Sequence, residues 1–152
     1  MKTVYLAGLI ATEHPETFAW RQQADLLLRG KFQVLSPLRG KEQLYDKVLS
    51  TTTDGGLTST KHTNRDIIMR DYQDVSRSDI ILVNLEVYGS KRALLGTIYE
   101  LAWAWDRKIP VVAICNSNNY LMRQHPFVEQ TVCHYFESVE QACLFTIGYF
   151  GE

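Results

Sequence analysis

The sequence predicts an α/β domain in which a mostly parallel, doubly wound sheet of five strands carries helices on both faces. Strand-like and helix-like segments alternate along the chain, which is typical of such domains. Two of the strand segments, residues 80–85 and 109–114, are apolar at nearly every position. Strands of that kind are covered on both faces, as in a parallel sheet. The 152 residues, 45% of them hydrophobic, suffice for one domain with a substantial core.

The first half of the chain contains two strand segments around one helix. Residues 3–10, "TVYLAGLI", form a short apolar run rich in strand formers. Residues 15–30 open with a proline, place apolar side chains at helical spacing and end at a glycine, which predicts a helix. Residues 31–37 predict a second strand that ends at Pro37. The polar stretch 38–62 is far longer than the usual connection in this fold, so it is either functional or mobile.

The second half continues the alternation through three further strands. The segment 64–78 is helical, with Ile67, Ile68, Tyr72 and Val75 on one side. The elements expected after it are a strand over 79–86, a helix over 96–108, a strand over 109–115, a short strand over 132–136 and a helix over 138–150. This order is that of a doubly wound, flavodoxin-like sheet.

The topology also predicts where a ligand binds. In such sheets the ligand lies beyond the carboxyl ends of the strands, at the point where the strand order reverses. The predicted site therefore comprises the segments 8–14, 36–45, 84–97 and 115–127.

Composition and charge exclude several classes of partner. The formal net charge of −1 gives no reason to expect nucleic acid or an anionic membrane. No apolar run approaches the roughly 20 residues of a membrane span, and the first residues lack the pattern of a signal peptide. The three cysteines are odd in number and lack C-x-x-C spacing. We therefore expect a reduced, cytoplasmic protein.

Several chemistries common on this fold lack their motifs. There is no G-x-x-x-x-G-K-[ST] phosphate loop, and no G-x-G-x-x-G follows the first strand. No cluster of histidine, cysteine and acidic residues has metal-ligand spacing, and no G-x-S-x-G presents a nucleophilic serine. Metal chemistry and dinucleotide binding are therefore not expected.

Glu100 is the one carboxylate in the apolar helix segment "GTIYELAWAW", residues 96–105. Two interpretations of it are evenly balanced. In the first, "TIYE" is a capping box, in which Thr97 caps the helix and Glu100 reaches back to the Thr97 backbone N–H. In the second, the apolar surroundings desolvate the carboxylate and raise its pKa, and its place at the ligand end of the sheet makes it catalytic.

Other candidate residues also have ordinary explanations. Asp71 and Asp74 lie on the helix before the third strand, where acids are commonly solvated. Tyr5, near the middle of the first strand, is by default a core residue whose buried hydroxyl needs a hydrogen-bond partner.

Several stretches, taken in order, resemble the nucleoside 2-deoxyribosyltransferase family. They are "VYLAGLI", "SPLRGK", "RDYQDVSRSDIILVNL" and "GTIYELAWAWDRKIPVV". The resemblance runs from residue 3 to about 115, and "HPF" at 125–127 with a closing helix extends it. It implies one deoxyribosyltransferase-like domain over residues 1–152. Such a domain moves 2-deoxyribose from a 2′-deoxynucleoside to a free purine or pyrimidine base in nucleotide salvage, and it needs no cofactor or metal.

The resemblance also implies roles for individual residues. Glu100 matches the nucleophile, which attacks C1′ and holds the sugar as an ester. Asp71 matches the acid that protonates the departing base, with Asp74 as the other candidate. Tyr5 matches a tyrosine that hydrogen-bonds the nucleophile, and Arg39 falls in the base-recognition loop. The further residues assigned to substrate binding are Gly8, Phe18, Gly96, Asn119 and His125. Phe18 and His14 are candidates for stacking on the base, and core and surface roles suit them equally.

One stretch departs from the family pattern and keeps a second activity open. Many members carry an acid some six residues before the nucleophile, where it binds the 5′-hydroxyl, and this chain has Leu94 there. Ser90, Lys91 and Arg92 precede it and suit a 5′-phosphate better. The alternative function is therefore a 2′-deoxynucleoside 5′-monophosphate N-glycosidase with the same nucleophile. Against it, the loop after the first strand, "LIATEHPE", contains two acids and no arginine. A non-enzymatic nucleotide-binding domain is the third alternative.

Finally, the resemblance implies a homo-oligomer with shared active sites. The C-terminal region of one subunit would complete the site of its neighbour, with Asn118, Asn119 and His125 as candidates. Aromatic residues over 97–106 and in "CLFTIGYF" suit a subunit contact, and they equally suit packing on the sheet.

Overall fold

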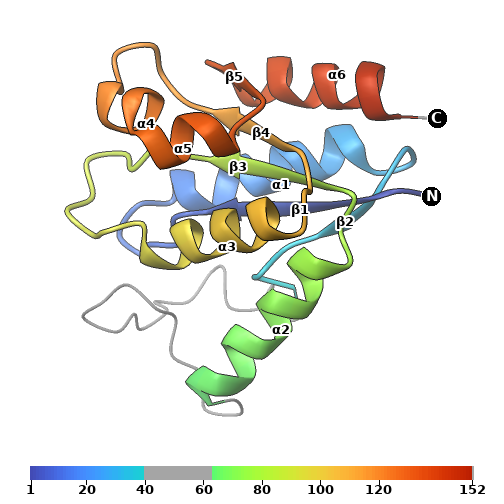
Figure 1. The fold of residues 1–152 in the computed structure, drawn as a ribbon, viewed down its shortest axis with the longest axis horizontal. Helices are drawn as coiled ribbons and strands as arrows, with labels where there is room; N and C mark the ends of the chain where they lie inside the picture. Colours follow the sequence, from blue (N-terminus) through green and yellow to red (C-terminus); the bar gives the residue numbers. More distant parts are fainter. Residues whose placement is uncertain (40–62, 152) are drawn as a thin grey trace.

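In the computed structural model, which describes residues 1–39 and 63–151, a parallel sheet has helices on both faces (Figure 1). The elements of the described residues are β1 (Thr3–Gly8), α1 (Glu16–Leu28), β2 (Gln33–Leu35), α2 (Asn64–Ser76), β3 (Ile80–Asn84), α3 (Leu95–Asp106), β4 (Val111–Ile114), α4 (Tyr120–Gln124), α5 (Pro126–Thr131), β5 (His134–Phe136) and α6 (Val139–Phe150). The predicted strands and long helices are confirmed, and the short helices α4 and α5 were not predicted. The stretch predicted to be functional or mobile lies, over residues 40–62, outside the described residues.

The strand order is β2-β1-β3-β4-β5, and every neighbouring pair is parallel. The chain moves outward from β1 to β2 and then crosses back to β3 on the other side of β1, so the order reverses between β1 and β3. This arrangement confirms the doubly wound fold class. Tyr5 lies at the centre of it, because it pairs with Leu35 of β2 and with Ile81 of β3.

Side chains of the central strands alternate between two cores. The core beneath α1 and α6 contains the strand residues Val4, Leu6, Ile80, Leu82, Val112 and Ile114. The core beneath α2, α3 and α5 contains the strand residues Tyr5, Ala7, Ile81, Val83, Val111 and Ala113. Because successive residues of a strand point to opposite faces, Tyr5 points toward the layer that holds α2 and α3.

Local capping explains where several helices begin. Thr63 and Asp66 form a reciprocal capping box at the start of α2, with N···O distances of 3.1 and 2.9 Å. The Ser138 hydroxyl accepts from the backbone N–H of Gln141 and caps α6. Pro126 occupies the first turn of α5, where its missing N–H is not needed.

The apolar side of α2 is only partly buried. Of the four apolar residues expected to share a face, Val75 is fully buried, whereas Ile68 is 44% exposed and Tyr72 37% exposed. The other buried residue of this helix is an acid, Asp74. The helix over Asn64–Ser76 agrees with the prediction that these residues share one side, and Asp74 is buried because its carboxylate binds Arg39 and Arg77.

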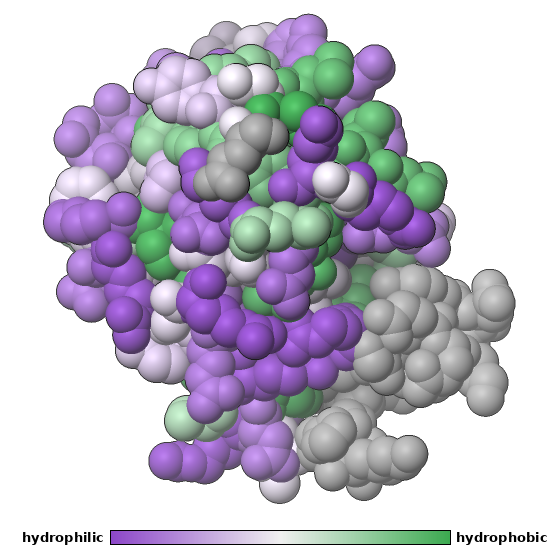
Figure 2. All heavy atoms as spheres, turned by 90° about the vertical axis from the view of Figure 1, so that its right-hand side faces the viewer, coloured by the Kyte–Doolittle hydropathy of each residue, from purple (hydrophilic) through white to green (hydrophobic). Residues whose placement is uncertain are grey.

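The two ends of the sheet have different surfaces. The end at which the strands begin faces the viewer in Figure 2, and its described side chains are largely hydrophilic. The loops after β1 and β3 lie at the opposite end (Figure 1). Among the helices of the described residues, none has the length and apolar character needed to cross a bilayer.

Candidate active site

A buried hydrogen bond joins the centre of the sheet to α3. The Tyr5 hydroxyl donates to Oε2 of Glu100, which lies 95 residues further along the chain. Tyr5 is fully buried and Glu100 is 7% exposed. The structure therefore brings together two of the residues that the sequence singled out.

The capping interpretation of Glu100 is wrong. Helix α3 begins at Leu95, two residues before Thr97, and among the described residues no side chain caps its first turn. An N-cap residue must lie at the edge of the helix with non-helical backbone angles, and Thr97 is instead a buried residue inside the helix. The carboxylate of Glu100 consequently bonds to a distant strand instead of to its own helix end.

The environment of Glu100 favours its protonated form. The pKa of Glu100 is raised from 4.5 to about 8, mainly by burial and also by the charge of Asp71. The hydrogen bond from Tyr5 and the charge of Arg21 act in the opposite direction. The same burial, together with the charges of Glu100 and Asp71, raises the pKa of Tyr5 well above its ordinary value, so its hydroxyl remains a donor.

Asp71 is the helix acid that acts on this pair. It is half-buried on α2, which packs against α3, and its charge raises the pKa of both Glu100 and Tyr5. The other candidate, Asp74, is held differently. Its carboxylate accepts from Arg39 Nη1 at 2.9 Å and from Arg77 Nη2 at 2.8 Å. Asp71 is therefore within electrostatic reach of Glu100, while Asp74 lies in an ion-pair network.

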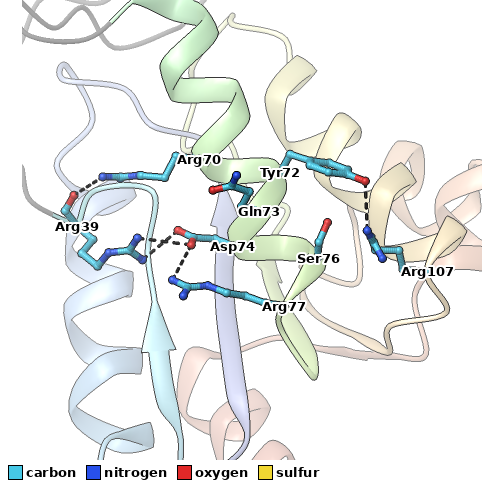
Figure 3. A pocket seen from close by; sticks show the side chains of 8 residues that line it. All are labelled: Arg39, Arg70, Tyr72, Gln73, Asp74, Ser76, Arg77 and Arg107. Atoms are coloured by element: carbon cyan, nitrogen blue, oxygen red, sulfur yellow. Dashed lines mark hydrogen bonds and ion pairs between the residues drawn. The ribbon is translucent and has the colours of Figure 1, made fainter.

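That network borders a hollow of about 510 Å³ (Figure 3). The hollow is lined by Arg39, Arg70, Tyr72, Gln73, Asp74, Ser76, Arg77 and Arg107. Besides the Arg39–Asp74 pair, Arg70 donates to the backbone carbonyls of Pro37 at 2.8 Å and Arg39 at 3.0 Å. These bonds fasten the segment after β2 to α2. The described residues that line the hollow include neither Tyr5 nor Glu100.

Arg21 is a buried cation that the sequence analysis missed. It is 2% exposed, and its guanidinium donates to the backbone carbonyls of Gly8 at 2.7 Å, Leu9 at 3.2 Å and Thr17 at 2.6 Å. It therefore fixes the carboxyl end of β1 against α1, and its charge lowers the pKa of Glu100. Arg21 falls on the helical stripe that also contains the buried residues Trp20 and Ala24, but the carbonyls that bind its guanidinium are not apparent from the sequence.

Gly8 ends β1 where three elements approach closely. A Cβ at this position would lie 3.0 Å from the backbone oxygen of Asn84 and 3.1 Å from Cζ2 of Trp20. Its φ of +154° is also one that other residues rarely adopt. Gly8 is thus required for packing, and its assignment to substrate binding stays a prediction.

The remaining predicted binding residues lie at the carboxyl end of the sheet. Gly96 is exposed in the first turn of α3, with no atom within 4 Å of an added Cβ, and Phe18 is half-buried in the first turn of α1. Asn119 caps α4 and donates to the carbonyl of Leu85 at 3.5 Å. His125 caps α5. These positions agree with the predicted location of the site, and the contacts with substrate remain predictions.

The loops after β1 and β3 are joined by an ion pair between Glu13 and Arg92. In residues 1–39 and 63–151, no three histidine, cysteine or acidic side chains lie close enough together to hold a metal ion. Separately, the described residues Glu100, Asp71 and Tyr5 form a group of titratable side chains that act on one another.

Comparisons with known proteins give a family and two similar folds. The family model described as nucleoside 2-deoxyribosyltransferase matches residues 4–144. The structure of a 2-deoxyribosyltransferase from Leishmania mexicana is similar with a TM-score of 0.62 and 18% identity, over 98% of this chain and 99% of that one. The structure of a CMP N-glycosidase from Clostridium botulinum is similar with a TM-score of 0.60 and 15% identity, over 97% of this chain and 100% of that one. A comparison with curated proteins gives no match.

Proposed function

The chain belongs to the nucleoside 2-deoxyribosyltransferase family, and we propose that it transfers 2-deoxyribose between nucleobases through a covalent intermediate on Glu100. The observation that carries this proposal is the buried pair of Glu100 and Tyr5, with the charge of Asp71 acting on both. A retaining glycosyl transfer uses two carboxyl groups, one as the nucleophile and one as the general acid and base. A desolvated carboxylate that is held by a hydrogen-bond donor and accompanied by a second acid suits this reaction.

In the first half of the reaction, an oxygen of the Glu100 carboxylate attacks C1′ of the 2′-deoxynucleoside. The C1′–N bond breaks, its electron pair goes to the base nitrogen, and Asp71 donates a proton to the departing base. The product is a deoxyribosyl ester of Glu100 and a free base. Two displacements at the same carbon retain the configuration of the sugar.

In the second half, the carboxylate of Asp71 takes a proton from an incoming base, whose nitrogen attacks C1′. The ester bond breaks and its electron pair returns to Glu100, which regenerates the enzyme. This scheme needs no metal or cofactor. Since attack requires the ionised carboxylate and its pKa is raised to about 8, the reaction should become faster as the pH rises from neutral toward that value.

Other residues have supporting roles in this proposal. The Tyr5 hydroxyl orients Glu100 and lowers its pKa. Arg39 belongs to the base-recognition segment, which Arg70 and Asp74 fasten to α2. Phe18 stacks on the base, while the small residues Gly8 and Gly96 leave room for the sugar.

We also propose that the protein is a cytoplasmic homo-oligomer of nucleotide salvage. Support comes from the outer face of α3, where apolar side chains are exposed: Leu95 (57%), Ile98 (38%), Tyr99 (57%) and Trp105 (49%). Such a contiguous apolar surface suits a subunit contact. Asn119 and His125 would then complete a neighbouring site. Sedimentation velocity tests this, and a protein that stays monomeric at micromolar concentration would contradict it.

The second candidate is the 2′-deoxynucleoside 5′-monophosphate N-glycosidase. The observation that favours it is Arg92, whose guanidinium lies between the loops after β1 and β3. Against it, Glu13 already binds that guanidinium.

Chromatography of a mixture of thymidine and free adenine with the enzyme distinguishes these activities. Deoxyadenosine indicates transfer, and free thymine with deoxyribose indicates hydrolysis. If neither product forms, a non-enzymatic nucleotide-binding role is favoured. In the same assay, Glu100→Ala should lose at least about three decades of rate, or about 4 kcal/mol of barrier. A folded Glu100→Ala protein with near-normal turnover would refute the nucleophile.

A further inference from the structure

The ion pair between Arg92 and Glu13 joins loops that are 79 residues apart in the chain. Arg92 Nε donates to Glu13 Oε1 at 3.0 Å, and Arg92 Nη2 lies 3.5 Å from Oε2. Both carboxylate oxygens therefore face the same edge of the guanidinium. The Arg92 side chain is 22% exposed and that of Glu13 46% exposed, so the pair lies at the surface within reach of a ligand.

The pair joins two loops at the end of the sheet where the topology predicts a ligand. Strands β1 and β3 are neighbours, and the strand order reverses between them. In doubly wound sheets, the loops that follow two such strands border the ligand. Glu13 comes from the loop after β1, and Arg92 comes from the loop after β3, three residues before the start of α3. The second turn of α3 carries Glu100.

A phosphate group and the Glu13 carboxylate would compete for the same guanidinium edge. Arginine binds both anions through paired hydrogen bonds of the same geometry. A hydrogen bond from its own backbone N–H and the charge of Arg92 lower the pKa of Glu13, so this competitor is ionised at neutral pH. Two more carboxylates lie near the loop after β3: alongside burial, the charges of Glu86 and Glu16 raise the pKa of Tyr88.

This inference rests on the proposed function and concerns the substrate class of the same site. The proposed reaction places C1′ at Glu100 and the base toward Asp71, and we assign the 5′ end of the sugar to the loops that precede α1 and α3. We propose that Glu13 is a specificity-determining residue, which holds Arg92 so that the site selects the 5′-hydroxyl of a 2′-deoxynucleoside over a 5′-phosphate. A dianionic phosphate has to displace Glu13 and lie beside the other carboxylates, whereas a neutral hydroxyl does neither.

The test compares thymidine with thymidine 5′-monophosphate in a set of matched variants. The quantity measured is the ratio of kcat/KM for the monophosphate to kcat/KM for thymidine. Glu13→Gln removes the charged competitor for Arg92 and should raise this ratio about 10- to 100-fold, as expected for a charge-assisted hydrogen bond to phosphate. Adding Arg92→Gln to Glu13→Gln should abolish the gain. Glu16→Gln removes the same charge at the start of α1 without a bond to Arg92, and it should raise the ratio much less.

The results separate this inference from the proposed function. A wild-type preference for the monophosphate, or an equal gain in Glu13→Gln and Glu16→Gln, would overturn it. If neither compound is turned over, the proposed function fails. The inference is then decided by calorimetry, as the ratio of the affinity for the monophosphate to the affinity for thymidine in each variant. Failure to bind either ligand would overturn both. The gain should also shrink with added salt, because the pair is partly exposed.

Discussion

Replacing Glu100 by glutamine should change the stability of the protein in a strongly pH-dependent way. Burial raises the pKa of this group from 4.5 to about 8 in the folded protein, and the unfolded chain solvates it. Between these values the folded state keeps a proton that the unfolded state has lost, so the contribution of Glu100 to stability is fully present below pH 4.5 and is lost as the pH rises toward 8. The free energy of unfolding should decrease by about 1.4 kcal/mol for each pH unit, or about 5 kcal/mol in total.

Glutamine has nearly the same shape and does not titrate, so the variant should lack this decrease. Urea unfolding of both proteins at several values between about pH 5 and about pH 8 gives the free energy of unfolding at each pH. The free energy of unfolding of Glu100→Gln minus that of the wild type should increase by about 4 kcal/mol from the lower to the higher pH. Asp106→Asn removes an exposed carboxylate from the end of the same helix and controls for the loss of a charge. A difference that stays constant with pH would refute the argument that burial keeps Glu100 protonated.

Three further predictions concern neighbouring residues. Tyr5→Phe removes the hydrogen bond that lowers the pKa of Glu100, so the acid limb of the kcat/KM profile should move to higher pH; an unmoved limb would contradict this. Asp71→Asn should slow natural nucleosides by about 10²–10⁴-fold and a nitrophenyl deoxyriboside, whose leaving group needs no proton, much less. Equal losses on both donors would show a different role. Asp74→Ala should lower the free energy of unfolding by about 1–3 kcal/mol in urea melts, because it breaks the charge-assisted bonds to Arg39 and Arg77; a stability within error of wild type would contradict it.

The local pattern of apolar residues was sufficient to predict the strands and helices that this pattern itself defines. The apolar runs of β3 and β4 predicted buried central strands, and both are fully buried. Likewise, a carboxylate in an apolar helix predicted a desolvated Glu100, which the structure confirms. The helices α4 and α5 were not predicted, because "NNYLMRQHPF" is short and has no apolar stripe.

The partners of polar side chains could not be predicted, because they come from distant parts of the chain. Arg21 looks like a solvated helix residue until the carbonyls of Gly8 and Leu9 are placed beside it. Thr97 and Glu100 fit a capping box in sequence, and only the earlier start of α3 excludes it. The Glu13–Arg92 pair depends on two loops that meet only when β1 and β3 are adjacent.

The distance along the chain between Tyr5 and Glu100 has a consequence for refolding experiments. A contact between residues 95 positions apart forms only after a large loop has closed, and such non-local contacts are slow to form. Helix content can return while this contact is still open, because helices form from local interactions. Recovery of enzymatic turnover after dilution from denaturant should therefore lag behind recovery of the circular dichroism signal. The recovery of turnover would then report when α3 docks onto the sheet, which is when the native topology is complete.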